Sequence, residues 1–165
     1  MSEVIYKEEI RSNLTTIIFA SLSLACLTLF AWRYAVVGWK FTPGLFCFLG
    51  LFFLFYTLNY RTLEIQISSD ELNLKFGLVK WTTVLENIDS WQLDDSPWWI
   101  KYGGAGVHFA AVRGKYRAYF NFLEYPRVLV TLQEKQGWVR QLCFTTRQPD
   151  QVQVQLQNRS ETHDS

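Results

Sequence analysis

Two long uncharged stretches constrain this chain more than any other feature. Residues 14–32 and 41–60 read LTTIIFASLSLACLTLFAW and FTPGLFCFLGLFFLFYTLNY, and neither contains Asp, Glu, Lys or Arg. Each is close to the ~20 residues that an α-helix needs to cross ~30 Å of hydrocarbon. A pair of buried core helices would need a soluble partner that covers them on every side, and only about a hundred of the 165 residues remain for it. The stretches therefore predict two transmembrane helices.

The flanks of these stretches predict their orientation. The linker between them is short, so we expect an antiparallel hairpin with both chain ends on one side of the membrane. That side carries Lys7, Arg11 and Arg61, whereas the linker carries Arg33 and Lys40. The positive-inside bias therefore favours cytoplasmic termini. The preceding segment MSEVIYKEEIR is mixed in charge and longer than the basic start of a signal peptide, so we predict an uncleaved anchor.

The rest of the chain has the sequence pattern of short β-strands. After Arg61, apolar residues alternate with polar ones in runs such as TLEIQI and ELNLKFG, and turn residues separate the runs. Similar runs, GVHFAAV, YRAYFNF, RVLVTLQ and WVRQLCF, follow towards the C-terminus. This spacing is typical of an antiparallel barrel or sandwich rather than a parallel sheet, and we expect about seven strands.

The segment RQPDQVQVQLQNR near the C-terminus gives conflicting local signals. Val152, Val154 and Leu156 alternate as in a strand. Pro149 and Asp150 suit the first turn of a helix, however, and Val152 and Leu156 are also spaced i, i+4. The local pattern favours strand and helix equally. The polar end, residues 159–165, is expected to be a disordered tail.

The order of these elements and parts of their amino-acid sequence resemble a known family. A two-helix hairpin, followed by YRTLEIQISSDELNLKFGLVKWTTVLENIDSW, KYGGAGVHF and RQLCFTTRQPDQVQVQL, is similar to the membrane-anchored bacterial pleckstrin-homology-like (PH-like) domains. The resemblance implies an α+β membrane protein of the bacterial inner membrane, with a transmembrane hairpin within residues 1–60. It implies a PH-like barrel or sandwich over residues 61–158, with two sheets packed nearly at right angles. A C-terminal helix that starts near Pro149 would close one end.

A glycine cluster formed by Gly103, Gly104 and Gly106 invites comparison with a phosphate-binding loop. Such a loop runs from a strand into a helix N-terminus, usually with a lysine and a hydroxyl residue after the glycines. Here the glycines lead into VHFAAV, which alternates like a strand, and no Gly-Lys-Ser or Gly-Lys-Thr follows. We therefore predict a structural turn or bulge that needs positive φ or a close backbone approach.

The sequence contains no legible catalytic or metal-binding constellation. His108 lies in a strand-like run without further ligands at usable spacing. Asp94 and Asp95 are adjacent, so they point to opposite faces of a strand and suit a strand exit better than an acid–base pair. Cys143 stands alone outside the two apolar stretches, which excludes a disulfide framework there. We predict a protein that is not an enzyme and that needs no cofactor or metal.

One candidate binding surface is basic. Arg113, Lys115 and Arg117 occur together in the run RGKYR and form the best candidate for contact with an anionic surface. Three charges near a membrane, at about 1 kcal/mol each, would orient the domain without conferring specificity. A solvated turn is the alternative interpretation of these residues.

A second candidate surface is aromatic. Trp98, Trp99 and Tyr102, in PWWIKY, form a candidate interaction patch because large rings line peptide grooves and rest at membrane interfaces. Filling the core of a small barrel is the alternative. Adjacent Trp98 and Trp99 cannot both point inward in a regular strand, so one ring is exposed or the strand bends.

The hairpin is the third candidate surface. Ser21 and Ala25 form a small-xxx-small pair, and Gly44 and Gly50 lie in the second stretch, so helices can approach closely there. The partner is left open by the sequence. It is the other helix of the hairpin, a second copy in a homo-oligomer, or another membrane protein.

The combined prediction is a non-enzymatic integral membrane protein. It presents a PH-like domain at the cytoplasmic membrane surface as a protein-interaction scaffold or regulatory subunit. Exposed strand edges and the groove beside the closing helix are the surfaces that such a fold offers to extended peptides. The alternative is a module that senses anionic lipid headgroups. The expected partners are the membrane and a protein of unknown identity, with no nucleic acid.

Overall fold

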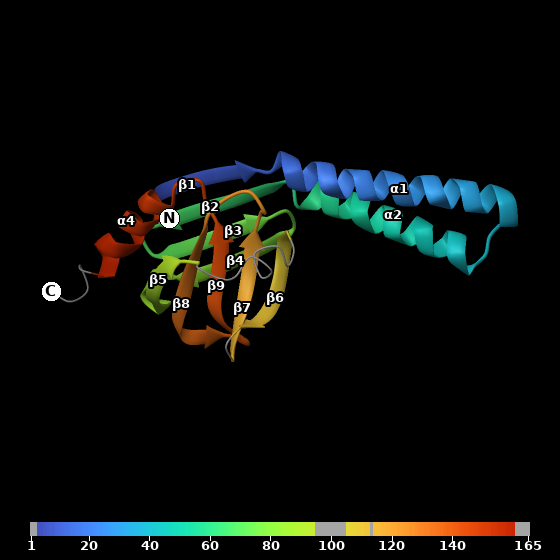
Figure 1. Cartoon of the computed structure of the whole chain (residues 1–165). Coiled ribbons are helices and arrows are strands. Elements are labelled where there is room, and N and C mark those ends of the chain that lie inside the picture. Colours follow the sequence, from blue (N-terminus) through green and yellow to red (C-terminus); the bar gives the residue numbers. More distant parts are fainter. Residues whose placement is uncertain (1–2, 95–104, 113, 161–165) are drawn as a thin grey trace. The chain divides into compact units, whose positions relative to one another are not determined.

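The structure is a computed structural model that describes residues 3–94, 105–112 and 114–160, with side chains up to residue 156 (Figure 1). The chain divides into two compact units. Residues 12–61 form the helical unit, and residues 1–11 together with 62–165 form the sheet unit. The fold is therefore of the mixed α+β class.

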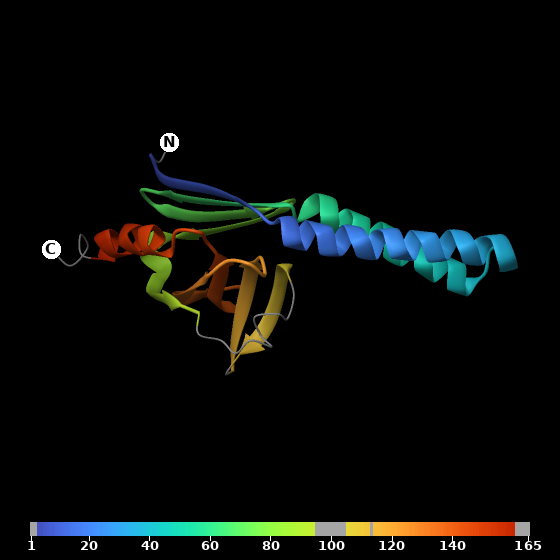
Figure 2. The same cartoon turned by 45° about the horizontal axis from the view of Figure 1, so that its top comes forward.

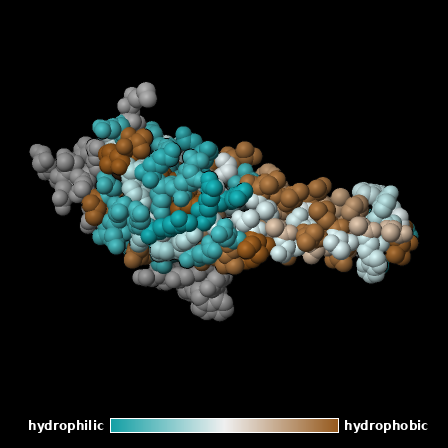
Figure 3. Space-filling model, turned by 90° about the horizontal axis from the view of Figure 1, so that it is seen from above, coloured by the Kyte–Doolittle hydropathy of each residue, from teal (hydrophilic) through white to brown (hydrophobic). Residues whose placement is uncertain are grey.

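The helical unit consists of α1 (Asn13–Val37) and α2 (Phe41–Asn59). Ser12 caps α1, because its Oγ accepts a hydrogen bond from the Thr15 N–H at 3.0 Å. α1 continues to Val37 rather than ending at Trp32. Both helices are long and apolar enough to cross a membrane. Many of their large apolar side chains are exposed, and Figure 3 shows hydrophobic residues along this unit.

A close contact between the two helices lies at Gly50. The Ser23 hydroxyl donates a hydrogen bond to the Gly50 carbonyl at 2.8 Å. A Cβ on Gly50 would lie 2.7 Å from Leu27 Cδ2 and 3.3 Å from Leu27 N, so the missing side chain permits the approach. Ser21 and Ala25 are exposed and take no part in this contact. Within the chain, Gly50 rather than the Ser21–Ala25 pair supports the hairpin.

The first sheet of the sheet unit has four strands in the order β1-β2-β3-β4, all antiparallel. The strands are β1 (Val4–Arg11), β2 (Thr62–Ser68), β3 (Glu71–Phe76) and β4 (Val79–Val84). The period of two that the sequence shows in β2 and β3 is confirmed, since one face of each strand is buried. The buried residues are Leu63, Ile65, Ile67, Leu72, Leu74 and Phe76.

The alternation of apolar and polar residues does not predict strand β1. The expected domain boundaries group residues 1–11 with the hairpin. In the structure they pair with β2, with Arg11 opposite Thr62. Ile10 is the one buried side chain among the eight residues of β1, so the strand carries almost no hydrophobic period. A single residue, Ser12, separates β1 from α1, and two residues separate α2 from β2. Both helices therefore connect along the chain to neighbouring, paired strands.

The second sheet has five strands in the order β5-β8-β9-β7-β6. The strands are β5 (Ile88–Leu93), β6 (Gly106–Val112), β7 (Lys115–Asn121), β8 (Arg127–Gln136) and β9 (Val139–Thr145); the short 3₁₀ turn η1 (Leu85–Asn87) precedes β5. β7 and β9 are parallel, so the antiparallel expectation is wrong for this pair. Within residues 61–158, where we expect about seven strands, the described residues contain eight (β2 to β9), and β1 adds a ninth. The strands form two separate sheets rather than one closed barrel.

Aromatic side chains join the two sheets, which Figures 1 and 2 show as two layers. Phe76 of the first sheet meets Phe122 after β7 at 4.9 Å between ring centroids. Trp81 meets Phe120 of β7 at 6.4 Å. These contacts define the inner face of the second sheet as the face that carries Phe120.

The C-terminal helix α4 (Pro149–Ser160) confirms the helix that the resemblance implies near Pro149. Val152 and Leu156, spaced i, i+4, are buried, whereas Val154 is exposed. A strand would place all three on one face. Contact with β1 and β5 therefore decides between two local patterns of equal weight.

Candidate functional site

Several of the predicted site residues lie outside the described residues. These are the aromatic group Trp98, Trp99 and Tyr102 and the glycines Gly103 and Gly104. Gly106 is described: it opens β6 with φ 99°, a backbone conformation that favours glycine. The chain after Gly106 continues as a strand and not as a helix.

The basic group does not form one surface. Arg113 lies outside the described residues, and Lys115 is exposed at the start of β7. Arg117 is only 5% exposed, and its guanidinium is paired inside the sheet unit. Arg117 is therefore removed from the proposed contact with an anionic surface, because a buried paired cation is not available to headgroups.

Arg117 belongs instead to a buried polar cluster on the outer face of the second sheet. Alternate residues of a strand face opposite sides, so Arg117 and Tyr119 lie on the face opposite Phe120 and away from the first sheet. The strand register extends this face to the neighbouring strands. Its members include His108 on β6, Gln141 and Cys143 on β9, and Arg127 on β8.

Asp94 is the centre of the cluster. Its N–H donates to the Arg127 carbonyl at 2.9 Å, which extends the β5–β8 pairing by one residue. Oδ1 lies 3.2 Å from Arg117 Nη1, and Oδ2 lies 3.0 Å from Arg127 Nη2. The Cys143 thiol donates to Oδ2 at 3.7 Å. Asp94 does leave a strand, as predicted, but as a buried ion-pair partner rather than as a solvated exit residue.

Arg117 has its hydrogen-bonding groups well occupied. Nε and Nη2 donate to Gln141 Oε1 at 3.2 and 3.0 Å, and Nη1 donates to the Tyr119 hydroxyl at 3.3 Å. Its guanidinium carbon lies 5.6 Å from the centre of the Tyr119 ring. This arrangement fixes one guanidinium group across the outer face of the sheet.

Arg127 is less well satisfied than Arg117. It is 6% exposed, and its Nη1 has no hydrogen-bond partner in the described chain. Its Nη2 makes the ion contact with Asp94 without a well-directed hydrogen bond. A buried guanidinium with unpaired N–H groups is costly, so this residue distinguishes the cluster from an ordinary structural ion pair.

Cys143 and His108 belong to the cluster but are uncharged at neutral pH, so they do not compensate the charge of the arginines. Burial, reinforced by the negative charge of Asp94, raises the pKa of the Cys143 thiol, which stays protonated at neutral pH. The His108 ring stacks on Tyr119 with centroids 4.7 Å apart and planes 5° apart. Burial and the Arg127 charge lower the pKa of His108, so its imidazole is neutral. Among the described residues, two guanidinium groups thus face one carboxylate.

A hollow of about 240 Å³ lies beside this cluster. Asp94 and Arg127 contribute to its wall, together with the segment between β7 and β8. The lining residues are Leu93, Asp94, Phe122, Leu123, Tyr125, Pro126 and Arg127. The hollow is therefore lined by two charged residues and by apolar ones.

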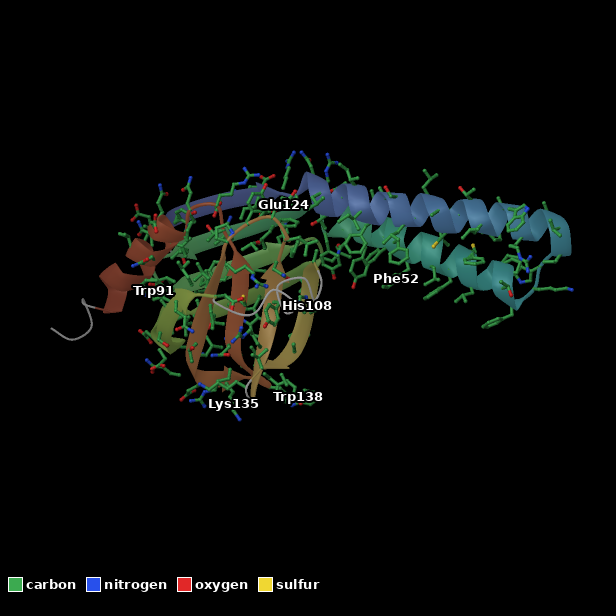
Figure 4. All side chains as sticks on the ribbon, in the orientation of Figure 1. Phe52, Trp91, His108, Glu124, Lys135 and Trp138 are labelled. Atoms are coloured by element: carbon green, nitrogen blue, oxygen red, sulfur yellow. The ribbon has the colours of Figure 1, made fainter. Side chains whose placement is uncertain are left out.

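A separate surface lies at the turns β6–β7 and β8–β9. Trp138 is 83% exposed and Tyr116 is 53% exposed, and their ring centroids are 6.5 Å apart. Lys115, at the start of β7, and Lys135, near the end of β8, are exposed close to these turns. Figure 4 shows Lys135 and Trp138 at one end of the second sheet. We call Trp138 and Tyr116 the aromatic pair.

Sequence reasoning missed both features for identifiable reasons. Trp138 opens the run WVRQLCF, and the pattern of this run predicts a strand without indicating that its first ring is exposed. Asp94 and Arg127 are 33 positions apart (127 − 94), and only the pairing of β5 with β8 brings them together. The available signal was the period of two in YRAYFNF, which places Arg117 on the same face as Tyr119.

Among the residues that the structure describes, no three His, Cys, Asp or Glu side chains gather in a way that could hold a metal ion. Comparison with protein-family models, curated proteins and solved structures finds no match.

Proposed function

We propose that the protein is integral to the membrane and that the sheet unit binds a protein partner there, as a scaffold or regulatory subunit. α1 and α2 have the length and apolarity that membrane spans need. The two sheets and the C-terminal helix agree in outline with the PH-like domain that the sequence resemblance implies. The same resemblance and the positive-inside bias support the bacterial inner membrane with cytoplasmic termini.

The short links between the units support a scaffolding role. One residue joins β1 to α1 and two residues join α2 to β2, so the sheet unit is held within a few residues of the spans. Confinement of this kind raises the effective concentration of a binding surface for any partner at the same membrane. It also limits how far the sheet unit travels from the bilayer.

The observation that carries the protein-binding role is the aromatic pair. An exposed tryptophan beside an exposed tyrosine is unusual on a surface that stays in water, and these residue types are enriched at binding hot spots. Leu78, in the β3–β4 turn, is equally exposed at 82% but has no aromatic ring. It provides a matched position for a control.

In-cell photo-crosslinking tests this proposal. A photoreactive amino acid at position 138 of the full-length chain is expected to form discrete protein adducts, and the same amino acid at position 78 is not. Equal adducts at both positions, or none at position 138, would refute the protein-binding role of the aromatic pair.

Anionic lipid headgroups are the second candidate, favoured by Lys115 and Lys135 next to the aromatic pair. Trp and Tyr rings settle at membrane interfaces, and nearby lysines attract anionic lipids. This candidate predicts lipid adducts from position 138, reduced when both lysines are replaced by glutamine. Protein adducts that persist in the double variant would exclude it.

Topology is tested separately with paired reporters fused after Ser165. A reporter that is active only in the cytoplasm is expected to give the signal. Activity of the external reporter instead would overturn the proposed orientation and direct the search for partners to the outside of the membrane.

A further inference from the structure

The buried polar cluster carries an inference that is independent of the aromatic pair. Arg127 opens β8, whereas Trp138 follows the end of this ten-residue strand. The two features therefore lie at opposite ends of β8. Evidence for or against binding at the aromatic pair does not bear on the cluster.

Arg127 is the least satisfied charged residue of the cluster among the described residues. Asp94 is the carboxylate at the centre, and its two oxygens already face Arg117 and Arg127. Arg117 also donates hydrogen bonds to Gln141 and Tyr119, but Arg127 Nη1 finds no acceptor in the described chain. Proteins rarely keep a guanidinium group buried without acceptors, because its desolvation is then not compensated.

We propose that Arg127 and its neighbours on the outer face of the second sheet form a binding site for an oxyanion, either a carboxylate or a phosphate group. The planar guanidinium fork matches both groups, which would supply the acceptor that Arg127 Nη1 lacks among the described residues. The hollow lined by Arg127 and Asp94 gives the route of approach. Because Nη1 is itself buried, binding requires the side chains around it to move.

The composition of the hollow narrows the ligand class further. Apolar side chains line it beside the charged pair, including Leu93, Phe122 and Pro126. Such walls suit an organic group that bears the oxyanion. Asp94 repels an anion at the same wall, so binding requires that the attraction of Arg117 and Arg127 exceed this repulsion.

Thermal unfolding of the full-length chain in detergent tests the proposal. The probes are sodium phosphate and sodium acetate, each compared with sodium chloride at equal ionic strength. At ten times its Kd, a bound probe is expected to raise the Tm of the β-sheet signal by about 3–6 °C. A rise with phosphate alone identifies a phosphate site, and a rise with acetate alone identifies a carboxylate site. No rise above chloride with either probe would overturn the proposal.

The variant Arg127→Lys keeps a cation opposite Asp94 but removes the planar fork. It is expected to weaken probe binding at least about tenfold, the discrimination typical of a lost charge-assisted hydrogen bond. Arg140→Lys is the matched control, because Arg140 lies on the neighbouring strand β9 and alternates to the opposite face from Gln141. Binding by Arg127→Lys at the wild-type level would refute the assignment.

A second measurement keeps the proposal testable if Arg127→Lys does not fold. The chain has two histidines, so selective ¹⁵N labelling gives separate signals for His108 and His163. His108 shares the face of the cluster, and its titration is sensitive to the Arg127 charge. The effective probe should shift the His108 signal in wild-type protein more than chloride does, and leave His163 unchanged. A His108 signal that responds as it does to chloride would contradict the site.

Discussion

Replacing Asp94 by asparagine is expected to destabilise the sheet unit by about 3–5 kcal/mol, the range for removing one partner of a buried ion pair. The side chains of Asp94, Arg117 and Arg127 are 2%, 6% and 4% exposed, so little water is available to solvate the cations that remain. At an effective dielectric constant of about 20, each contact of about 3 Å corresponds to ~5 kcal/mol of attraction before desolvation is subtracted. Both contacts lose their charge in the variant.

The assay is urea unfolding of the full-length chain in detergent, followed by the β-sheet signal. With a slope of about 2 kcal/mol per molar urea, the expected loss lowers the midpoint by roughly 1.5–2.5 M. Glu64→Gln is the control, because it removes the same kind of charge from the exposed Lys75–Glu64 pair at 3.2 Å. That change is expected to cost about 0–1 kcal/mol. An Asp94→Asn midpoint equal to that of the control would refute the reasoning.

Three further predictions concern other parts of the chain. Gly50→Ala should weaken the hairpin by about 1–3 kcal/mol in SDS unfolding, since the added Cβ would meet the α1 backbone at 3.3 Å. The control Gly44→Ala should leave the stability of the hairpin unchanged, because the nearest atom to its added Cβ is 3.9 Å away. Glu8→Gln should destabilise the sheet unit by about 1 kcal/mol in urea unfolding, because the Glu8 carboxylate accepts hydrogen bonds from Thr146 Oγ1 at 2.6 Å and from the Arg147 N–H at 2.9 Å, just before α4. The control Glu9→Gln should leave the stability unchanged, because Glu9 bonds only to the exposed Arg11 side chain among the described residues. The lowered pKa of His108 means that the folded state prefers neutral imidazole, so its contribution to stability is present above pH 6.5 and lost as pH falls below it. His108→Phe should flatten this slope, of at most about 1.4 kcal/mol per pH unit, between pH 7.5 and pH 5.

The two long helices and strands β2 and β3 could be predicted from the sequence, because their patterns involve only neighbouring residues. An uncharged run of about twenty residues satisfies the length rule for a span without reference to any other segment. The period of two in β2 and β3 likewise reflects one buried face, and Leu63, Ile65 and Ile67 lie on it. In the C-terminal segment the local pattern favoured strand and helix equally. The burial of Val152 and Leu156, four residues apart, shows that packing favoured the helix.

The features that carry the functional proposals depended on contacts between distant residues. Alternation indicates that Arg117 and Tyr119 share a face, but it cannot tell whether that face is covered or exposed. The pairing of β7 with β9, and of β5 with β8, brings Arg117, Asp94 and Arg127 together, and all three are buried.

The sequence by itself determined the two long apolar helices and the alternating strands β2 and β3, because each is a property of neighbouring residues. The tertiary structure decided that residues 4–11 form a strand, that Asp94 joins two buried arginines and that Trp138 stays exposed. These outcomes follow from strand order and register. Register places a side chain beside partners far away in the sequence, and those partners set its charge, burial and chemistry.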